Sequence, residues 1–245
     1  MEIAPVNQVI DYAHRMGITS PLPPYESLAL GAGDIAPLDM AAAFGVYPNH
    51  GVYVEPNSIL KIEDKDGNVI EENFPMQREV LSEETAFIMT SMLQGVVNGG
   101  TGSHVRDYFQ LPAAGKTGTT TDFADAWFVG YTPQISAAVW IGFDNKSVHF
   151  KTWDGQGGRA AAPIWGRFMR YVYDDQGIAM PLEYFEKPAK VYEDTICAET
   201  KKLATEYCPT RMPEYFTEKT RPGKCNKHTT SKWREGEEGM GTISF

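Results

Sequence analysis

The sequence lacks any apolar run approaching the roughly 20 residues that a helix needs to cross a bilayer. Its first residues, Met1 to Asn7, also lack the basic start and the apolar stretch of a secretory signal peptide. We therefore expect neither a transmembrane segment nor a signal segment within these 245 residues.

Basic residues are in the minority. The chain has 22 Lys and Arg against 32 Asp and Glu, which gives a formal net charge of −10. Because nucleic-acid binding needs a basic face to neutralise phosphates, this balance argues against a nucleic-acid partner. Hydrophobic residues make up 42% of the chain, which is typical of a globular protein. At this length, a folded chain buries roughly 70–75% of its unfolded surface, so a substantial core is expected.

Several common catalytic patterns are missing as well. The chain has neither a His-Glu-x-x-His zinc motif nor a Gly-x-Ser-x-Gly nucleophile elbow. A phosphate-binding P-loop ending at Gly115-Lys116-Thr117 would need glycine where Gln110 stands, and Pro112 would lie inside the loop. The following residues lead into a β-rich run rather than a helix. These features argue against nucleotide binding.

Hydrophobic periodicity predicts a mixed α+β fold with helices packed on an antiparallel sheet. Helices are predicted over residues 5–16, 37–47, 82–98 and from 163 onward. Strands are predicted over residues 52–54, 59–70 (with a hairpin turn at 65–68), 127–132 and 135–143. The last two are joined too tightly for a crossover helix, so they are expected to be antiparallel neighbours. Beyond about residue 185 we expect an irregular, polar tail.

A set of short motifs surrounds Lys116-Thr117-Gly118. They are Ser27-Leu-Ala-Leu-Gly-Ala-Gly, Pro37-Leu-Asp-Met-Ala, Asp125-Ala-Trp-Phe-Val-Gly-Tyr-Thr-Pro, Val139-Trp-Ile-Gly-Phe-Asp and Gly157-Gly-Arg-Ala-Ala-Ala-Pro-Ile-Trp. In this order the set resembles the transpeptidase domain of class A bifunctional penicillin-binding proteins, which polymerise and cross-link peptidoglycan. The resemblance spans roughly residues 5–185 and implies part of the fold shared by penicillin-recognising serine transpeptidases and β-lactamases. The tail is similar too, with Cys208-Pro209, Phe216 and Cys225-Asn-Lys-His228.

The resemblance implies an acyl transfer. A serine attacks the carbonyl of the penultimate D-alanine of a stem peptide, releases the terminal D-alanine and forms an acyl-enzyme. An amine of a second stem peptide then takes the acyl group from the serine. Lys116 would support the proton relay and attract the substrate carboxylate, which the hydroxyls of Thr117 and Thr119 would bind, with Thr120 in the same substrate-binding segment. Gly118 would leave room for the substrate backbone, and the Thr119 N–H would donate to the oxyanion. No metal or organic cofactor is implied for this chemistry.

This sequence departs from the family in the two other motifs, Ser-x-x-Lys and Ser-x-Asn. No Asn has a Ser two positions before it, and the one literal Ser-x-x-Lys runs from Ser58 to Lys61. That segment is predicted to be a strand, in which residues three apart point to opposite faces. We therefore expect the C-terminal part of a transpeptidase domain, incomplete on its N-terminal side and inactive alone. The strand over 135–143 would then have an open edge.

The expected partners follow from the same resemblance. They are the peptidoglycan stem peptide or its lipid-linked precursor, β-lactams as inhibitors of the intact domain, and the N-terminal part of the same domain. The parent protein would carry a glycosyltransferase domain upstream and be anchored in the cytoplasmic membrane, with this domain in the periplasm. The alternative is a non-catalytic module that binds peptidoglycan or a protein partner. A β-lactamase-type hydrolase is a third reading, and the missing serine counts against it as well.

All three cysteines lie in the tail, so residues 186–245 are predicted to be separate from the transpeptidase portion, 1–185. The tail contains Cys197, Cys208, Cys225 and His228. A Cys3His set can hold tetrahedral zinc, but only Cys225 and His228 are closely spaced. Because the parent family works outside the cytoplasm, where disulfides persist, we favour one disulfide with one free cysteine. A zinc site and three free thiols are the alternatives, and the sequence does not give the pairing.

Overall fold

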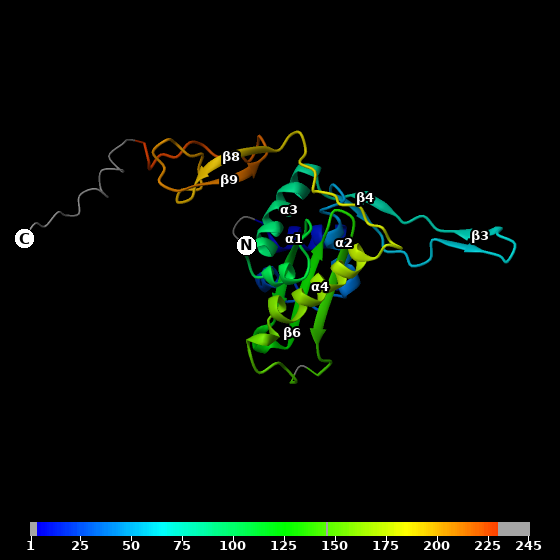
Figure 1. The fold of residues 1–245 in the computed structure, drawn as a ribbon. Coiled ribbons are helices and arrows are strands. Elements are labelled where there is room, and N and C mark those ends of the chain that lie inside the picture. Colours follow the sequence, from blue (N-terminus) through cyan, green and yellow to red (C-terminus); the bar gives the residue numbers. More distant parts are fainter. Residues whose placement is uncertain (1–3, 146, 230–245) are drawn as a thin grey trace, which may run out of the picture. The chain divides into compact units, whose positions relative to one another are not determined.

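The computed structural model describes residues 4–145 and 147–229. The chain divides into two compact units, unit 1 (Met1–Glu186) and unit 2 (Lys187–Phe245), which are drawn in sequence colours in Figure 1. Within the described residues, no helix is both long enough and apolar enough to cross a membrane.

Unit 1 is built around a three-stranded antiparallel sheet. Its strands are β5 (Ala114–Thr119), β6 (Asp125–Tyr131) and β7 (Ser136–Gly142), in the order β5-β6-β7. β6 and β7 are joined by a short turn and pair along their whole length, so the predicted antiparallel pair is confirmed. Across the described ranges, β7 pairs with no strand other than β6, which leaves its outer edge open.

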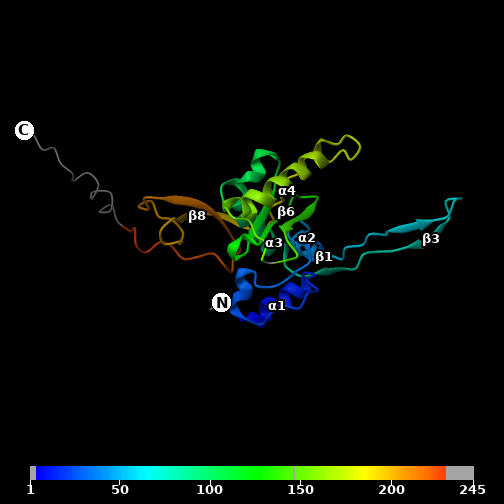
Figure 2. The ribbon, with the colours of Figure 1, turned by 90° about the horizontal axis from the view of Figure 1, so that it is seen from below.

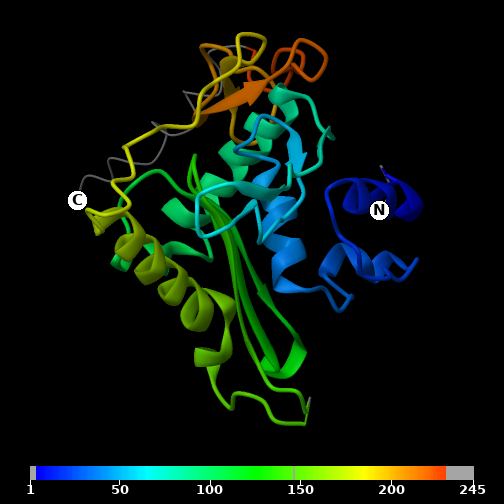
Figure 3. The same ribbon diagram turned by 90° about the vertical axis from the view of Figure 1, so that its right-hand side faces the viewer.

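Helices cover both faces of this sheet, as Figure 3 shows. On one face lies α4 (Gly157–Asp174), whose Trp165 ring meets Phe128 of β6 at 5.4 Å between ring centroids. On the other face lies α2 (Pro37–Gly45). α3 (Glu83–Asn98) packs along β5, with Leu93 beside Tyr131 and Val97 in the cluster that contains Phe128 and Trp165. The main core cluster consists of the buried residues Val97, Val105, Phe109, Ala113, Phe128, Ala161, Ala162, Trp165 and Met169. The α+β class with packed helices is confirmed.

The N-terminal half of unit 1 contributes one further helix and two small strand pairs. These elements are α1 (Val6–Arg15), β1 (Val52–Val54) paired with β4 (Gln77–Glu79), and β2 (Lys61–Glu63) paired with β3 (Val69–Glu72). The β2–β3 hairpin is drawn in cyan in Figure 2. The Asp64 side chain accepts N–H bonds from Asp66 and Asn68, at 2.8 and 2.9 Å, and thereby closes the predicted turn.

Short 3₁₀ turns connect several elements. They are η1 (Glu26–Leu30), η2 (Ser103–Asp107), η3 (Thr121–Phe123) and η4 (Trp153–Gly155). Ser82 caps α3 as predicted, because its hydroxyl accepts the Thr85 N–H at 3.3 Å.

One helix boundary differs from the sequence prediction. The prediction that α4 begins at Pro163 is wrong, since the helix begins at Gly157 and carries Pro163 in its interior. An interior proline costs roughly 3 kcal/mol of helix stability. The cost is offset because the helix buries, against the sheet and the segment 101–108, a continuous stripe. Its buried members are Gly157, Gly158, Ala161, Ala162, Trp165, Gly166 and Met169.

Unit 2 contains strands that the sequence analysis did not predict. β8 (Tyr192–Cys197) and β9 (Arg211–Phe216) form an antiparallel pair from Tyr192↔Phe216 to Cys197↔Arg211. The apolar residues that unit 2 buries within the described range are few: Val191, Ile196, Cys197, Cys208 and Cys225.

Candidate functional site

The Lys-Thr-Gly motif lies on β5, at one edge of the central sheet. β5 pairs with β6 in the register Lys116↔Val129, Thr117↔Phe128 and Gly118↔Trp127. No other strand pairs with β5 in the described portion of the chain. Lys116 and Thr119 are exposed, whereas Thr117 and Gly118 are half-buried. The predicted site residues therefore lie together on an accessible strand.

The hydrogen bonding of β5 shows which backbone groups point away from the sheet. The Thr120 N–H donates to the carbonyl of Asp125 at 3.1 Å, across the β5–β6 pair. In an antiparallel pair, alternate residues direct both their N–H and C=O groups toward the same neighbour. The backbone N–H and C=O groups of Lys116 and Gly118 therefore point toward β6, as those of Thr120 do. Thr117 and Thr119 direct their N–H and C=O groups to the opposite, unpaired side.

The Lys116 ammonium lies along the same open side. Its Nζ donates to the carbonyl oxygen of Thr117 at 2.9 Å. The hydroxyls of Thr117 and Thr101 share a hydrogen bond of 2.7 Å. The open edge thus presents one cation, two backbone N–H groups and a pair of hydroxyls. An extended chain with a carboxylate could pair with such an edge as an added strand.

The first turn of α4 holds Thr119 in place. The Gly157 N–H donates to the Thr119 hydroxyl oxygen at 3.0 Å, so the hydroxyl proton remains available to donate. A Cβ on Gly157 would lie 2.3 Å from the carbonyl oxygens of Gly118 and Trp127. A Cβ on Gly158 would lie 2.1 Å from the carbonyl oxygen of Thr101. Only glycine permits this close approach of helix and strand.

Thr120 occupies a different position from its neighbours. Its hydroxyl accepts the N–H of Asp125 at 2.8 Å and closes the turn between β5 and β6. The substrate-binding role of Thr120 stays a prediction. Thr101, Gly157 and Gly158 were not predicted as site residues. Their only signal in the sequence was glycine: Gly99, Gly100 and Gly102 surround Thr101, and Gly157 and Gly158 are adjacent.

The literal Ser-x-x-Lys sequence does not lie at a helix start. Ser58 is exposed in a bend, and Lys61 is the first residue of β2. Lys61 Nζ instead lies 2.5 Å from the carboxylate of Glu63. These positions do not bring a serine hydroxyl and a lysine amine together on one helical turn.

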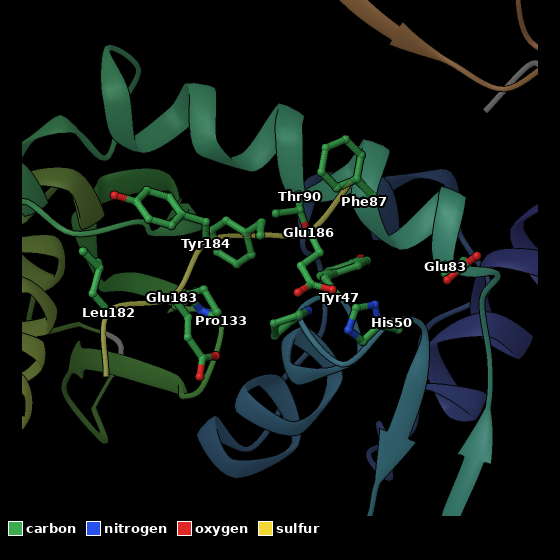
Figure 4. Close-up of a pocket in the computed structure, with 12 residues that line it drawn as sticks. Tyr47, His50, Glu83, Phe87, Thr90, Pro133, Leu182, Glu183, Tyr184 and Glu186 are labelled. Atoms are coloured by element: carbon green, nitrogen blue, oxygen red, sulfur yellow. The ribbon is translucent and has the colours of Figure 1, made fainter. Parts of the chain in front are cut away.

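A pocket of about 420 Å³ lies elsewhere in unit 1 (Figure 4). Beside it, the buried Tyr131 hydroxyl bonds to Thr90 at 3.0 Å, and burial raises the pKa of Tyr131. Tyr131 pairs with Ala114 at the start of β5, whereas Thr119 ends that strand. The pocket is therefore separate from the Lys116 edge. Its lining consists of Tyr47, Pro48, His50, Glu83, Phe87, Thr90, Pro133, Leu182, Glu183, Tyr184, Phe185 and Glu186.

Unit 2 brings the three cysteines and His228 together. All four side chains are buried, and their ligand atoms lie within 4.8 Å of one another. The cysteines are free thiols. The Thr200 hydroxyl, which donates to the Cys225 sulfur at 3.3 Å, lowers the pKa of Cys225. The disulfide that the sequence analysis favoured is therefore not formed in the structure.

Comparison with known protein families gives a match in each unit. Residues 22–170 match the penicillin binding protein transpeptidase domain. Residues 187–230 match the C-terminal domain of penicillin-binding protein 1A. The chain belongs to the penicillin-binding protein transpeptidase family, and its relatives are class A enzymes.

Individual relatives carry the name penicillin-binding protein 1A. The protein of Aquifex aeolicus is 38% identical over 214 residues, which is 87% of this chain and 28% of the relative. That of Clostridium acetobutylicum is 42% identical over 164 residues, 65% of this chain and 20% of the relative. The chain thus spans between a fifth and a third of the length of these two relatives.

Solved structures show the same fold. Penicillin-binding protein 1A from Haemophilus influenzae aligns with a TM-score of 0.79 at 25% identity, covering 89% of this chain and 37% of that one. PonA1 from Mycobacterium tuberculosis, solved in complex with penicillin V, aligns with a TM-score of 0.63 at 26% identity. That alignment covers 74% of this chain and 52% of the other.

Proposed function

We propose that unit 1 forms the Lys-Thr-Gly wall of a serine D,D-transpeptidase site and binds the D-Ala-D-Ala end of a peptidoglycan stem peptide. The observation that carries the proposal is the unpaired edge of β5, where Thr117 and Thr119 direct their N–H groups outward. A stem peptide in extended conformation would add to this edge as a strand. Its terminal carboxylate would lie near the ammonium of Lys116.

Each group then has a separate task. The N–H of Thr119 stabilises the oxyanion that forms when a serine attacks the peptide carbonyl. The hydroxyls of Thr117 and Thr119 donate to the substrate carboxylate, and their positions are fixed by Thr101 and Gly157. The nucleophile and its lysine base come from a part of the domain that precedes this chain. β-Lactams, which imitate the D-Ala-D-Ala end, occupy the same edge in the complete domain.

This assignment places the protein in peptidoglycan cross-linking outside the cytoplasmic membrane. The parent protein carries the membrane anchor and a glycosyltransferase domain, and this chain by itself does not form an acyl-enzyme.

The first test is intact-mass analysis of the 245-residue chain after incubation with penicillin. We expect no covalent adduct, because the only literal Ser-x-x-Lys, at Ser58 and Lys61, lacks the geometry of a nucleophile and base. An adduct of one penicillin per chain would overturn the proposal, and peptide mapping would then identify the serine that carries it.

The second test uses the longer protein that supplies the serine. Lys116→Ala is expected to slow penicillin acylation about 10- to 100-fold, because a hydrogen bond to a charged group is worth about 1.5–3 kcal/mol. Lys65→Ala is the matched control, since Lys65 lies on the exposed β2–β3 turn with 90% of its side chain accessible. Equal acylation rates for the two variants would contradict the role of Lys116. A non-catalytic binding module would show no acylation in any variant.

A further inference from the structure

Unit 2 gathers four metal-binding side chains from separate segments. Cys197 ends β8, Cys208 precedes β9, and Cys225 and His228 follow β9. Their relative exposures are 0%, 3%, 3% and 2%, and the four ligand atoms lie within 4.8 Å of one another. Folding has therefore placed three sulfurs and one imidazole around a single point.

The orientation of His228 favours a metal. Its Nδ1 lies 3.4 Å from the sulfur of Cys197 and 3.5 Å from that of Cys225. With Zn–S bonds of about 2.3 Å and Zn–N bonds of about 2.0 Å, tetrahedral ligand atoms lie about 3.5–3.8 Å apart. The other ring nitrogen, Nε2, lies 3.1 Å from a carboxylate oxygen of Glu199. A carboxylate behind a ligating histidine fixes its tautomer and directs the opposite nitrogen to the metal.

Two of the three sulfurs also accept hydrogen bonds. The Thr200 hydroxyl donates to the sulfur of Cys225, and the Thr205 N–H donates to that of Cys208, both at 3.3 Å. Donors of this kind stabilise sulfur in its thiolate form, which is the form that binds metals.

The small core of unit 2 gives the cluster a structural purpose. The three cysteines form a hydrophobic cluster of unit 2, and among the described residues Ala204 is the one partly buried apolar residue packed against them. Domains this small have too little apolar surface to fold securely, and natural examples add a metal or disulfides. A single disulfide would join two of the three cysteines and leave the third thiol and His228 buried beside it. A metal uses all four groups.

We propose that Cys197, Cys208, Cys225 and His228 bind one zinc ion that holds unit 2 together. Four protein ligands close the coordination shell and leave no position for a substrate, so the site is structural rather than catalytic. Zinc suits this set because three thiolates and one imidazole match its preferred tetrahedral ligands. The site uses only residues of unit 2 and is independent of the proposed transpeptidase function.

The direct test is the metal content of the full chain, purified without added chelator and without a reductant strong enough to break a disulfide. Elemental analysis and native mass spectrometry are expected to show one zinc per chain. Cobalt exchanged into the site should give the thiolate charge-transfer bands and intense visible bands of tetrahedral cobalt. Removal of zinc by a strong chelator should abolish hydrogen-exchange protection of the β8–β9 amides and leave that of β5–β7 unchanged.

Variants separate the ligands from the rest of the chain. Cys208→Ser and His228→Gln should each lose stoichiometric zinc, whereas His149→Gln, an exposed histidine of unit 1, should keep it. Because ligand variants can also unfold unit 2, Glu199→Gln supplies an independent measurement. It preserves all four ligands, so the tetrahedral cobalt spectrum should remain while zinc affinity falls about 10- to 100-fold.

Three results for the unmodified chain would overturn the proposal. One is a chain without metal that has lost the mass of two hydrogens and carries a single alkylatable thiol, which indicates a disulfide. Another is a metal-free chain with three alkylatable thiols and a protected β8–β9 pair. The third is iron in place of zinc. Zinc retained by Cys208→Ser at wild-type affinity would equally contradict the assigned ligands.

Discussion

Replacement of Gly157 by alanine tests the contact between α4 and β5. The added Cβ would lie 2.3 Å from two carbonyl oxygens, those of Gly118 and Trp127. Carbon and oxygen atoms in close contact ordinarily stay about 3.3–3.6 Å apart, so the helix and strands must separate by about 1 Å. Both oxygens belong to the paired backbones of β5 and β6, which cannot move away without disturbing their hydrogen bonds.

The cost follows from this crowding. Overpacking a well-packed contact typically costs about 1–3 kcal/mol. For a unit of this size, each kcal/mol changes the melting temperature by about 2–4 °C, so Gly157→Ala should lower it by about 2–12 °C. In the longer protein the same change should slow acylation, because the Gly157 N–H positions the Thr119 hydroxyl.

The matched control is Gly95→Ala. Gly95 lies inside α3, and a Cβ there meets nothing within 4 Å. Alanine should therefore stabilise the helix by up to about 1 kcal/mol. Thermal and urea unfolding followed by tryptophan fluorescence reports on unit 1, which holds four of the five tryptophans: Trp127, Trp140, Trp153 and Trp165. If both glycine variants shift the transition in the same direction, a Cβ at residue 157 does not destabilise unit 1 through the close approach of α4 and β5.

Two further predictions concern the stability of unit 1, each measured by urea unfolding. Tyr131→Phe should cost about 0.5–1.5 kcal/mol, because Thr90 keeps its bond to the Ala86 carbonyl, whereas Thr90→Val should cost about 1–3 kcal/mol by leaving the buried Tyr131 hydroxyl without that partner. The double variant should cost less than the sum, and strict additivity would show that the two hydroxyls are not coupled. Ser82→Ala should cost about 1 kcal/mol through loss of the α3 cap, and Ser82→Asp should retain most of that stability. Equal midpoints for the two Ser82 variants would show that the cap contributes nothing.

Local sequence signals predicted much of unit 1 because they act over a few residues. The Ser82 cap, the turn at Asp66-Gly67 and the short β6–β7 connection each depend on neighbours in the chain. The start of α4 was predicted too late because Pro163 is the strongest local signal. Packing of the Gly157-Gly158 turn against β5 outweighs that signal.

For the functional residues, too, the sequence predicted the local features and the packing decided the rest. The sequence by itself determined that Lys116, Thr117, Gly118 and Thr119 form one β-strand of a penicillin-binding transpeptidase domain. The order of the motifs carries that information without reference to distances. The sequence could not show which backbone groups of β5 point outward, since that depends on pairing with β6.

In unit 2 only the tertiary structure shows how the three cysteines and His228 are arranged. The spacing argued against a metal because only Cys225 and His228 are close in the chain, and the location outside the cytoplasm that the resemblance implies favoured a disulfide. The pairing of β8 with β9 brings Cys197 and Cys208 together. The final described segment then returns Cys225 and His228 to the same point. Long-range strand pairing fixes such distances, and it depends on contacts between residues that no local pattern encodes.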